Sequence, residues 1–378
     1  MLLLQQLKND PQAVVAALAK RNLEAAPLIE EVLALDERRR ALQTELDQNA
    51  ARANQLAKSI GQLFQSGKAP EAEALKSETA QLKDLNKQIQ QEMDACALAL
   101  QEKLYLLPNT PHHSVPQGKS AEDNETVFEA GRIPQLHQDA LPHWDLAKKY
   151  DLIDFELGVK IAGAGFPVYK GKGARLQRAL IQFFLDFNTE AGYTEIQPPH
   201  LVNEASGYGT GQLPDKEGQM YHVGVDDLYL IPTAEVPVTN LFRDVLLTQN
   251  QLPVAYTAYT PCFRREAGSY GAHVRGLNRL HQFDKVEIVR VEHPERSYQA
   301  LEEMVDHVKK ILDALQLPYR ILKLCGGDMG FTSALTYDFE LYSTAQERWL
   351  EISSVSNFET FQANRLKLRF KDETGKNQ

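Results

Sequence analysis

The stretch that decides the fold of this chain runs from Phe263-Arg-Arg-Glu266, through twelve further residues, to Arg279-Leu-His-Gln-Phe-Asp-Lys-Val-Glu287. The two outer segments are typical of β-strands, and the segment between them has the length of a loop. Three glycines lie in that loop: Gly268, Gly271 and Gly276. Because glycine is permitted in turns that other residues avoid, the pattern predicts two strands joined by a long loop.

Each predicted strand carries an arginine and a carboxylate, and one of them adds an aromatic ring. Arginine suits phosphate because its planar guanidinium donates two parallel hydrogen bonds and stays charged. A polyphosphate, an ammonium group and a flat ring would all find partners here. The residues concerned are Arg264, Glu266, Arg279, Phe283 and Glu287. The simpler alternative is a hairpin with cross-strand Arg–Glu pairs, which are common and stabilise little.

The first third of the chain carries a heptad pattern of apolar residues. From Leu28 to Leu63 the seam positions step alternately by four and three, and only Arg39 and Asn49 interrupt it. The segment 66–70 (SGKAP) then predicts a turn, and a second apolar stripe runs from Leu75 to Leu107. Two long helices joined by a short turn fold back on each other, so we expect an antiparallel helical hairpin.

The heptads alone fit a dimerisation or spacer element as well as an RNA-binding arm. Between residues 28 and 107 there are 10 Lys or Arg against 13 Asp or Glu, so net charge does not favour RNA. A local basic face could still come from a subset of side chains. These are Arg38, Arg39, Arg40, Arg52, Lys58, Lys76, Lys83 and Lys87.

Composition excludes several classes of protein. The 378 residues carry a net charge of −10, from 41 Lys and Arg against 51 Asp and Glu, which excludes a generally basic nucleic-acid binder. The cysteines, Cys96, Cys262 and Cys325, form no C-x-x-C pair, so we expect no disulfide framework and no zinc site, and a cytoplasmic location. No apolar run approaches the length of a membrane span.

Three prolines, Pro108, Pro111 and Pro116, break the helical periodicity and predict a linker over residues 108–125. Beyond it, strand-like runs at 228–231, 254–256 and 286–289 mix with helical patterns at 174–191 and 297–315. Because strands and helices do not alternate as βαβ units, the sequence predicts an α+β domain on a mostly antiparallel sheet.

The spacing of the opening stretch resembles motif 2 of the class II aminoacyl-tRNA synthetases, and residues 192–201 (GYTEIQPPHL) resemble motif 1, part of their dimer interface. Longer stretches resemble the seryl-tRNA synthetases in particular: TAE at 233–235, FRREAGS at 263–269, HQFDKVE at 281–287 and EISSVSNF at 351–358. The helical hairpin resembles that family's N-terminal arm. The resemblance implies a coiled-coil arm followed by a class II antiparallel sheet flanked by helices.

The resemblance also implies roles for individual residues. Thr233, Ala234 and Glu235 would bind the L-serine substrate, with Thr233 and Glu235 at its ammonium group. Glu287 would accept a hydrogen bond from the serine hydroxyl. A site built around one hydroxyl rejects amino acids that lack it.

For ATP, the resemblance implies that Arg264 bridges the serine carboxylate and the α-phosphate, and that Arg279 holds the outer phosphates; we expect these two arginines to be the catalytic residues. Glu266 would contact the adenine amino group and Phe283 would stack on the ring. The remaining ATP-binding residues would be Arg265, Glu351, Ile352, Ser353 and Ser354. Glu351 and Ser354 would also bind Mg²⁺.

We therefore expect an N-terminal helical domain at 1–107 that binds tRNA, a linker at 108–125 and a catalytic domain at 126–378. Nothing after Glu351 resembles the third motif of the class, a Gly-rich strand and helix with an arginine. We expect the catalytic domain to be C-terminally incomplete and the 378-residue chain to be impaired for that reason.

The expected activity is that of a homodimeric ligase that uses ATP to convert L-serine to seryl-adenylate and then transfers the seryl group to the 3′ end of tRNA(Ser). The sequence leaves open whether tRNA(Sec) is charged as well. Two alternatives are a ligase that charges a carrier protein, against which the long arm argues, and a non-catalytic RNA-binding or scaffold paralogue.

Overall fold

The computed structural model describes residues 1–215, 218–266 and 275–378. The chain forms two compact units: residues 2–19 and 23–108 make one, and Met1, residues 20–22 and residues 109–378 make the other. We call them the helical unit and the sheet unit. None of the helices in the described ranges combines the length and apolar character that crossing a membrane requires.

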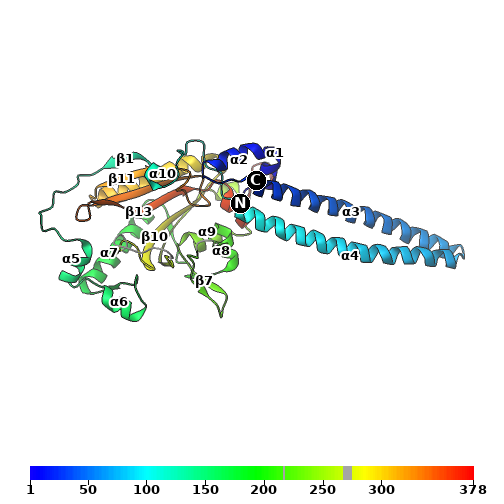
Figure 1. The fold of residues 1–378 in the computed structure, drawn as a ribbon, viewed down its shortest axis with the longest axis horizontal. Coiled ribbons are helices and arrows are strands. Elements are labelled where there is room, and N and C mark those ends of the chain that lie inside the picture. The colour runs from blue at the N-terminus through cyan, green and yellow to red at the C-terminus, as the bar shows by residue number, and fades with distance from the viewer. Residues whose placement is uncertain (216–217, 267–274) are drawn as a thin grey trace. The chain divides into compact units, whose positions relative to one another are not determined.

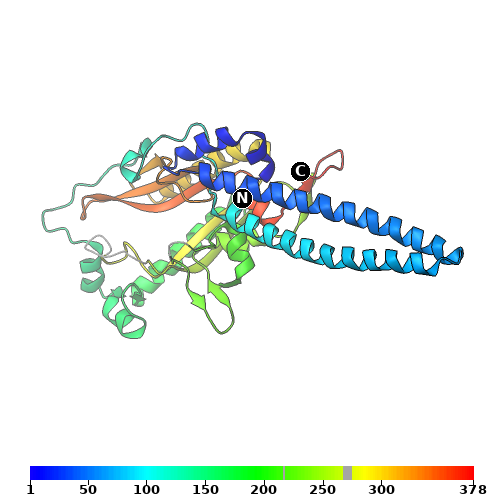
Figure 2. The same cartoon turned by 45° about the vertical axis from the view of Figure 1, so that its right-hand side comes forward.

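The helical unit consists of four helices: α1 (Leu4–Asn9), α2 (Pro11–Ala19), α3 (Ala26–Gln65) and α4 (Ala69–Leu106). Figures 1 and 2 show α3 and α4 running antiparallel and side by side. Every predicted seam position from Leu28 to Leu63 is buried or half-buried, whereas most other positions of α3 are exposed. The predicted helical hairpin is therefore confirmed, because the heptad seam is the face that α4 covers.

The second helix of the hairpin begins earlier than its apolar stripe indicates. It starts at Ala69, so Pro70 lies in its first turn and not in a turn between helices. Proline is tolerated there because the first N–H groups of a helix have no intrahelical partner. The expected turn at 66–70 shortens to the three residues between α3 and α4.

Ion pairs within the hairpin involve most of the basic residues considered for an RNA-binding face. Arg38 pairs with Glu92 at 2.5 Å, and Arg52 pairs with Glu78 at 2.8 Å, in both cases from one helix to the other. Arg39 and Arg40 both pair with Asp36, a buried carboxylate. The pairs of Arg38 and Arg52 join α3 to α4 and favour one register of the two helices, although each exposed pair stabilises by only about 0.2–1 kcal/mol.

The sheet unit carries the remaining elements. Its α-helices are α5 (His143–Lys149), α6 (Phe155–Ile161), α7 (Gly171–Glu190), α8 (Glu204–Thr210), α9 (Glu235–Asn240), α10 (Ser297–Ala314) and α11 (Phe361–Leu366). Its strands are β1 (Glu125–Ala130), β2 (Ile153–Asp154), β3 (Val168–Tyr169), β4 (Thr194–Glu195), β5 (Leu201–Asn203), β6 (His222–Val223), β7 (Leu228–Leu230), β8 (Leu246–Thr248), β9 (Val254–Phe263), β10 (Gln282–Val291), β11 (Tyr319–Lys323), β12 (Leu335–Ser343), β13 (Arg348–Asn357) and β14 (Arg369–Lys371).

Two sheets carry the candidate site. One has the strand order β1-β11-β12-β13 and is antiparallel throughout. The other has the order β10-β9-β4, in which β9 and β10 are antiparallel and only the short β4 runs parallel to β9. Three smaller sheets pair β14 with β8, β2 with β3, and β5 with β7 and β6. The predicted α+β class with a mostly antiparallel sheet is confirmed.

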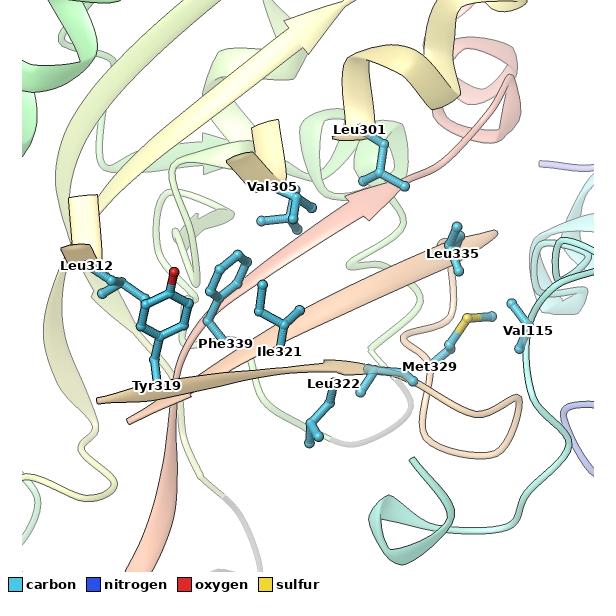
Figure 3. Close-up of a cluster of buried hydrophobic side chains, with 12 residues drawn as sticks. Val115, Leu301, Val305, Leu312, Tyr319, Ile321, Leu322, Met329, Leu335 and Phe339 are labelled. Atoms are coloured by element: carbon cyan, nitrogen blue, oxygen red, sulfur yellow. The ribbon is translucent and has the colours of Figure 1, made fainter. Parts of the chain in front are cut away.

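The main core lies between α10 and one face of the four-stranded sheet. Figure 3 shows Leu301, Val305 and Leu312 of α10 pointing toward Ile321 and Phe339 of the strands. Phe339 is fully buried. Because side chains alternate along a strand, the opposite face of β12 and β13 is left for polar residues, and it is there that part of the candidate site lies.

The predicted linker follows α4 without regular structure up to a 3₁₀ turn at Ala121–Asp123, but it is tied down. The side chain of Asn109 is buried and donates to Thr332 O at 3.0 Å and to Phe358 O at 2.9 Å. Arg21 donates to Asn109 O at 2.8 Å. The start of this segment is therefore a docked part of the sheet unit.

Candidate active site

The β9–β10 hairpin supplies the frame of the candidate site. The two strands pair over ten residues, from Gln282 opposite Phe263 to Val291 opposite Val254. Alternation places Phe283, Lys285 and Glu287 on one face of β10. The loop that connects the strands and contains Gly268 and Gly271 lies partly outside the described residues. Residues 267–269, the end of the 263–269 segment, also lie outside them.

Glu287 is the centre of a small polar network. The Thr233 hydroxyl donates to Glu287 Oε2 at 2.5 Å, and Lys285 Nζ lies 3.2 Å from the same oxygen. Lys285 Nζ also donates to Thr233 Oγ1 at 3.2 Å, and the Glu235 backbone N–H donates to that oxygen at 3.3 Å. Both acceptor positions of the hydroxyl are thus in use. Within the described residues, Glu287 Oε1 receives no protein hydrogen bond.

Glu235 provides a second carboxylate beside this network, at the first position of α9. Gln362 of α11 donates to Glu235 Oε1 at 2.5 Å. Burial, and then the nearby charge of Glu287, raise the pKa of Glu235 to about 7. The hydrogen bond from Gln362 opposes that shift, since it favours the ionised carboxylate. Two carboxylates close together in a desolvated place are a natural site for a cation.

The side chain of Ala234, also expected in the site, points elsewhere. Ala234 is fully buried and packs with Val238 and Ala258, beneath the turn that carries Thr233. Its methyl group therefore fixes the turn against β9 and offers no polar atom.

The arginines of the motif lie at the loop end of the hairpin, next to the pair formed by Phe263 and Gln282. The Arg264 guanidinium is over the ring of Phe283, with 5.2 Å from its carbon to the ring centroid, and its Nε donates to Pro232 O at 3.3 Å. Arg279 pairs with Glu266 at 2.5 Å. The neighbouring Arg265 is held through its backbone, which donates to Gln219 O at 2.8 Å. The ring of Phe283 and the guanidinium group of Arg264 are thus close together.

A β-bulge in β13 positions the last group of expected residues. Glu340 of β12 pairs with Glu351, but the adjacent Phe339 pairs with Ser353, so Ile352 is an extra residue and is 46% exposed. In a regular strand, residues three apart lie on opposite faces. The bulge brings Glu351 and Ser354 onto one face, away from the core.

Ser353 lies on the other face, opposite Phe339. Its side chain is therefore on the core side of the sheet and is separated from Glu351 and Ser354. Glu351 and Ser354, the first and last of the four consecutive residues expected at ATP, therefore lie on the same face of the sheet. Ile352 is the exposed bulge residue between the two faces.

Asp338 joins Glu351 and Ser354 from the neighbouring strand. It pairs with Ser354 in the strand register, and its Oδ1 is buried without a hydrogen-bond partner. Desolvation and then the Glu351 charge raise the pKa of Asp338 to about 7, against a hydrogen bond from Ser354. Desolvation also raises the pKa of Glu351, and the nearby charges of Arg264, Lys285 and Arg279 oppose that rise.

The oxygens of Asp338, Glu351 and Ser354 fit a hard divalent cation, because a buried carboxylate oxygen without a partner calls for a positive charge. The described ranges contain no group of three or more His, Cys, Asp or Glu side chains arranged as a metal site. An ion here would therefore complete its ligand shell with water or with oxygens of a bound phosphate.

Three residues of this site were not expected from the sequence: Lys285, Gln362 and Asp338. Lys285 was within a quoted motif, and its alternation with Phe283 and Glu287 was the signal that could have identified it. Gln362 contacts Glu235 across 127 positions of sequence, and no local pattern indicates such a contact. Asp338 could be found only from the pairing of β12 with β13.

Comparison with known proteins agrees with this geometry. Residues 1–111 match the seryl-tRNA synthetase N-terminal domain, and residues 221–378 match the tRNA synthetase class II core domain of the G, H, P, S and T enzymes. A serine–tRNA ligase of Salinibacter ruber is 52% identical over 372 residues, which are 98% of this chain and 87% of that protein. The chain belongs to the seryl-tRNA synthetase family.

Other members of the seryl-tRNA synthetase family support the same assignment. A serine–tRNA ligase of Neisseria meningitidis serogroup C is 47% identical over 384 residues, covering 100% of this chain and 88% of the relative. The crystal structure of seryl-tRNA synthetase from Pyrococcus horikoshii complexed with ATP has a TM-score of 0.93 at 30% identity, covering 100% of this chain and 88% of that one. The fold is thus that of a class II synthetase of this family.

Proposed function

We propose that this chain activates L-serine with ATP to form seryl-adenylate and pyrophosphate, and then transfers the seryl group to the 3′ end of tRNA(Ser). The observation that carries this proposal is the Thr233–Lys285–Glu287 network beside Glu235. It offers a carboxylate for an ammonium group and, on Glu287, one carboxylate oxygen that no described residue engages, which is available for a hydroxyl. Membership of the family supports the same substrate.

Serine would lie with its ammonium group at the Glu235 carboxylate and its hydroxyl at Glu287 Oε1. The Thr233 hydroxyl has both acceptor positions occupied by Lys285 and by the Glu235 N–H. We therefore assign Thr233 mainly to holding Glu287. A substrate without the hydroxyl would leave the Glu287 oxygen desolvated and unpaired, which is the basis for rejecting alanine.

ATP would lie at the loop end of the β9–β10 hairpin. The Phe283 ring would stack on adenine and Glu266 would accept from its amino group, while Arg279 would hold the outer phosphates. For Glu266 to meet adenine and Arg279 to meet phosphate, their ion pair at 2.5 Å must open. Arg264 would bridge the serine carboxylate and the α-phosphate and stabilise the charge that develops there.

Glu351 and Ser354 would hold Mg²⁺, which supplies positive charge to the phosphates. Asp338 accepts a hydrogen bond from Ser354, so the lone pairs of the Ser354 hydroxyl remain available for the ion. The chemistry needs no protein nucleophile, because the serine carboxylate attacks ATP directly. Cys262, the nearest thiol, is fully buried, and burial raises its pKa to about 11, which excludes it from that role.

We assign tRNA binding to the α3–α4 hairpin. Of the basic residues considered there, Lys58, Lys83 and Lys87 have no ion pair within the described residues. The exposed pairs of Arg38 and Arg52 are weak enough to exchange for phosphate. A dimerisation or spacer role for the hairpin is the alternative, and the arm's excess of acidic residues favours it.

We also propose a homodimer formed by the sheet unit. Apolar side chains are exposed on α6, notably Val159 and Ile161, and Leu176 is exposed on α7. Exposed apolar patches on soluble proteins mark interaction sites. A monomeric mass by light scattering at micromolar concentration would contradict this part of the proposal. A cytoplasmic location, in line with three free cysteines, remains part of the same proposal.

The test of the proposed function is pyrophosphate exchange into ATP with each amino acid in turn. Serine alone should support exchange well above background. Exchange without any tRNA charging in a second assay would favour a ligase for a carrier protein. The absence of exchange with every amino acid would favour a non-catalytic paralogue.

A further inference from the structure

We propose that Lys285 is a positioning residue for serine recognition: with Thr233 it engages one oxygen of Glu287, so that the other is aimed at the substrate hydroxyl. This inference rests on the proposed function and goes further, because it explains how one carboxylate distinguishes serine from alanine.

The two carboxylate oxygens of Glu287 differ in their hydrogen-bond partners. Oε2 accepts from the Thr233 hydroxyl at 2.5 Å and lies 3.2 Å from Lys285 Nζ. Oε1 has no protein donor among the described residues. A carboxylate fixed through one oxygen cannot rotate freely about its terminal bond, so the direction of the other oxygen is fixed as well.

Lys285 lies on the same face of β10 as Glu287. It is two residues before Glu287 on β10, so the two side chains point the same way, and they lie opposite Thr260 and Ala258 of β9. The Glu287 side chain is only 15% exposed and that of Lys285 is 34% exposed. A carboxylate so poorly solvated needs a positive partner before any substrate arrives.

The contact to Thr233 makes the arrangement a triangle. Lys285 Nζ donates to Thr233 Oγ1 at 3.2 Å, while that hydroxyl donates its own proton to Glu287. Lys285 has only donors, so it forces the Thr233 proton toward the carboxylate. Removing Lys285 would free both Thr233 and Glu287 to turn, and the hydroxyl of serine would lose a fixed acceptor.

The test measures how much the substrate hydroxyl adds to the binding affinity, by comparing a probe that has the hydroxyl with one that lacks it. The probes are the non-hydrolysable adenylate analogues seryl-sulfamoyl-adenosine and alanyl-sulfamoyl-adenosine, with binding measured by calorimetry. Lys285→Met should weaken the seryl probe by about tenfold or more, the size of one hydrogen bond to a charged group. The alanyl probe should change by less than about twofold, because it has no hydroxyl to lose.

Several variants separate positioning from loss of structure. Lys285→Arg should restore part of the seryl preference, since it keeps the charge. Lys323→Met removes another partly buried lysine, paired with Glu125 at 3.3 Å, and should leave both probes unchanged. In a Glu287→Gln background, Lys285→Met should cause little further loss of preference, because Lys285 acts through Glu287.

Equal weakening of both probes would mean that Lys285 only supports the fold or binds the adenylate, and would overturn the proposal. Tighter binding of both probes by Lys285→Met would also overturn the proposal. It would mean that the Lys285 ammonium and the substrate ammonium compete for the same carboxylates. If the unaltered protein bound neither probe, the proposed function itself would fail. That result can be told apart from the two outcomes above, because they concern the variant and this one concerns the unaltered protein.

Discussion

The hydrogen bond from Gln362 to Glu235 gives the sharpest prediction about pH. Gln362→Met keeps the length of the side chain and removes the donor at 2.5 Å. That donor favours the ionised carboxylate, so its loss should raise the pKa of Glu235 further above its present value of about 7. A hydrogen bond to a charged group contributes about 1.5–3 kcal/mol, and 1.36 kcal/mol corresponds to one pKa unit. The expected rise is about one to two units.

The sign of the effect follows from the role of Glu235. Only its ionised form attracts the serine ammonium, so serine activation is present above the pKa and is lost as pH falls through it. For the unaltered protein, kcat/KM for serine should fall below a pH of about 7, and for Gln362→Met below about 8–9. At pH 7 the variant should therefore be about five- to fiftyfold less efficient, from the fraction of ionised Glu235 alone.

The assay is the pH profile of kcat/KM for serine in pyrophosphate exchange, with the melting temperature as a check on folding. As pH rises over the range in which the serine ammonium stays charged, the variant should draw closer to the unaltered protein, which a folding defect would not permit. An acid limb that stays at the same pH while activity drops uniformly would show that Gln362 does not set the pKa of Glu235. A limb that moves to lower pH would contradict the sign of the predicted shift.

Glu287, Asp338 and the α3–α4 hairpin each allow a further test. Glu287→Ala should reduce serine activation by about a hundredfold or more and leave the KM for ATP nearly unchanged, because only the hydroxyl loses its partner; an equal loss for both substrates in exchange kinetics would contradict the assignment. Asp338→Ala should raise the Mg²⁺ concentration needed for ATP binding by about tenfold, as measured by calorimetry across a Mg²⁺ titration, since Ser354 loses its orienting acceptor; an unchanged Mg²⁺ dependence would show that Asp338 does not orient it. Deleting residues 28–107 and rejoining the ends should leave pyrophosphate exchange largely intact while aminoacylation falls steeply, and undiminished charging would show that the hairpin is a spacer or dimerisation element.

The sequence was sufficient wherever a local pattern determines the structure. The heptad seam from Leu28 to Leu63 predicted α3 and its packing face, since burial follows directly from a periodic apolar stripe. The strand-like runs at 254–256 and 286–289 proved to be parts of the longer strands β9 and β10. The run at 254–256 covers only the first three residues of β9, and the run at 286–289 covers only an inner part of β10, because polar residues interrupt the apolar pattern in the rest of each strand.

The rest depends on contacts between distant segments. The bulge at Ile352 places Glu351 and Ser354 on one face, and no sequence pattern predicts where a strand gains an extra residue. The partners of Glu235 and Ser354, which are Gln362 and Asp338, come from α11 and β12. The early start of α4 at Ala69 was missed because Pro70 ends helices in most positions but begins them in the first turn.

We propose that this chain selects serine by its hydroxyl and joins it to tRNA. The most direct measurement is mass spectrometry of the aminoacyl group recovered from tRNA after incubation with ATP, Mg²⁺, the protein and an equimolar mixture of all twenty amino acids. We expect seryl-tRNA and no alanyl-tRNA, with the seryl product reduced by about a hundredfold or more in the Glu287→Ala variant. Recovery of a different aminoacyl group, or of none, would contradict this proposal.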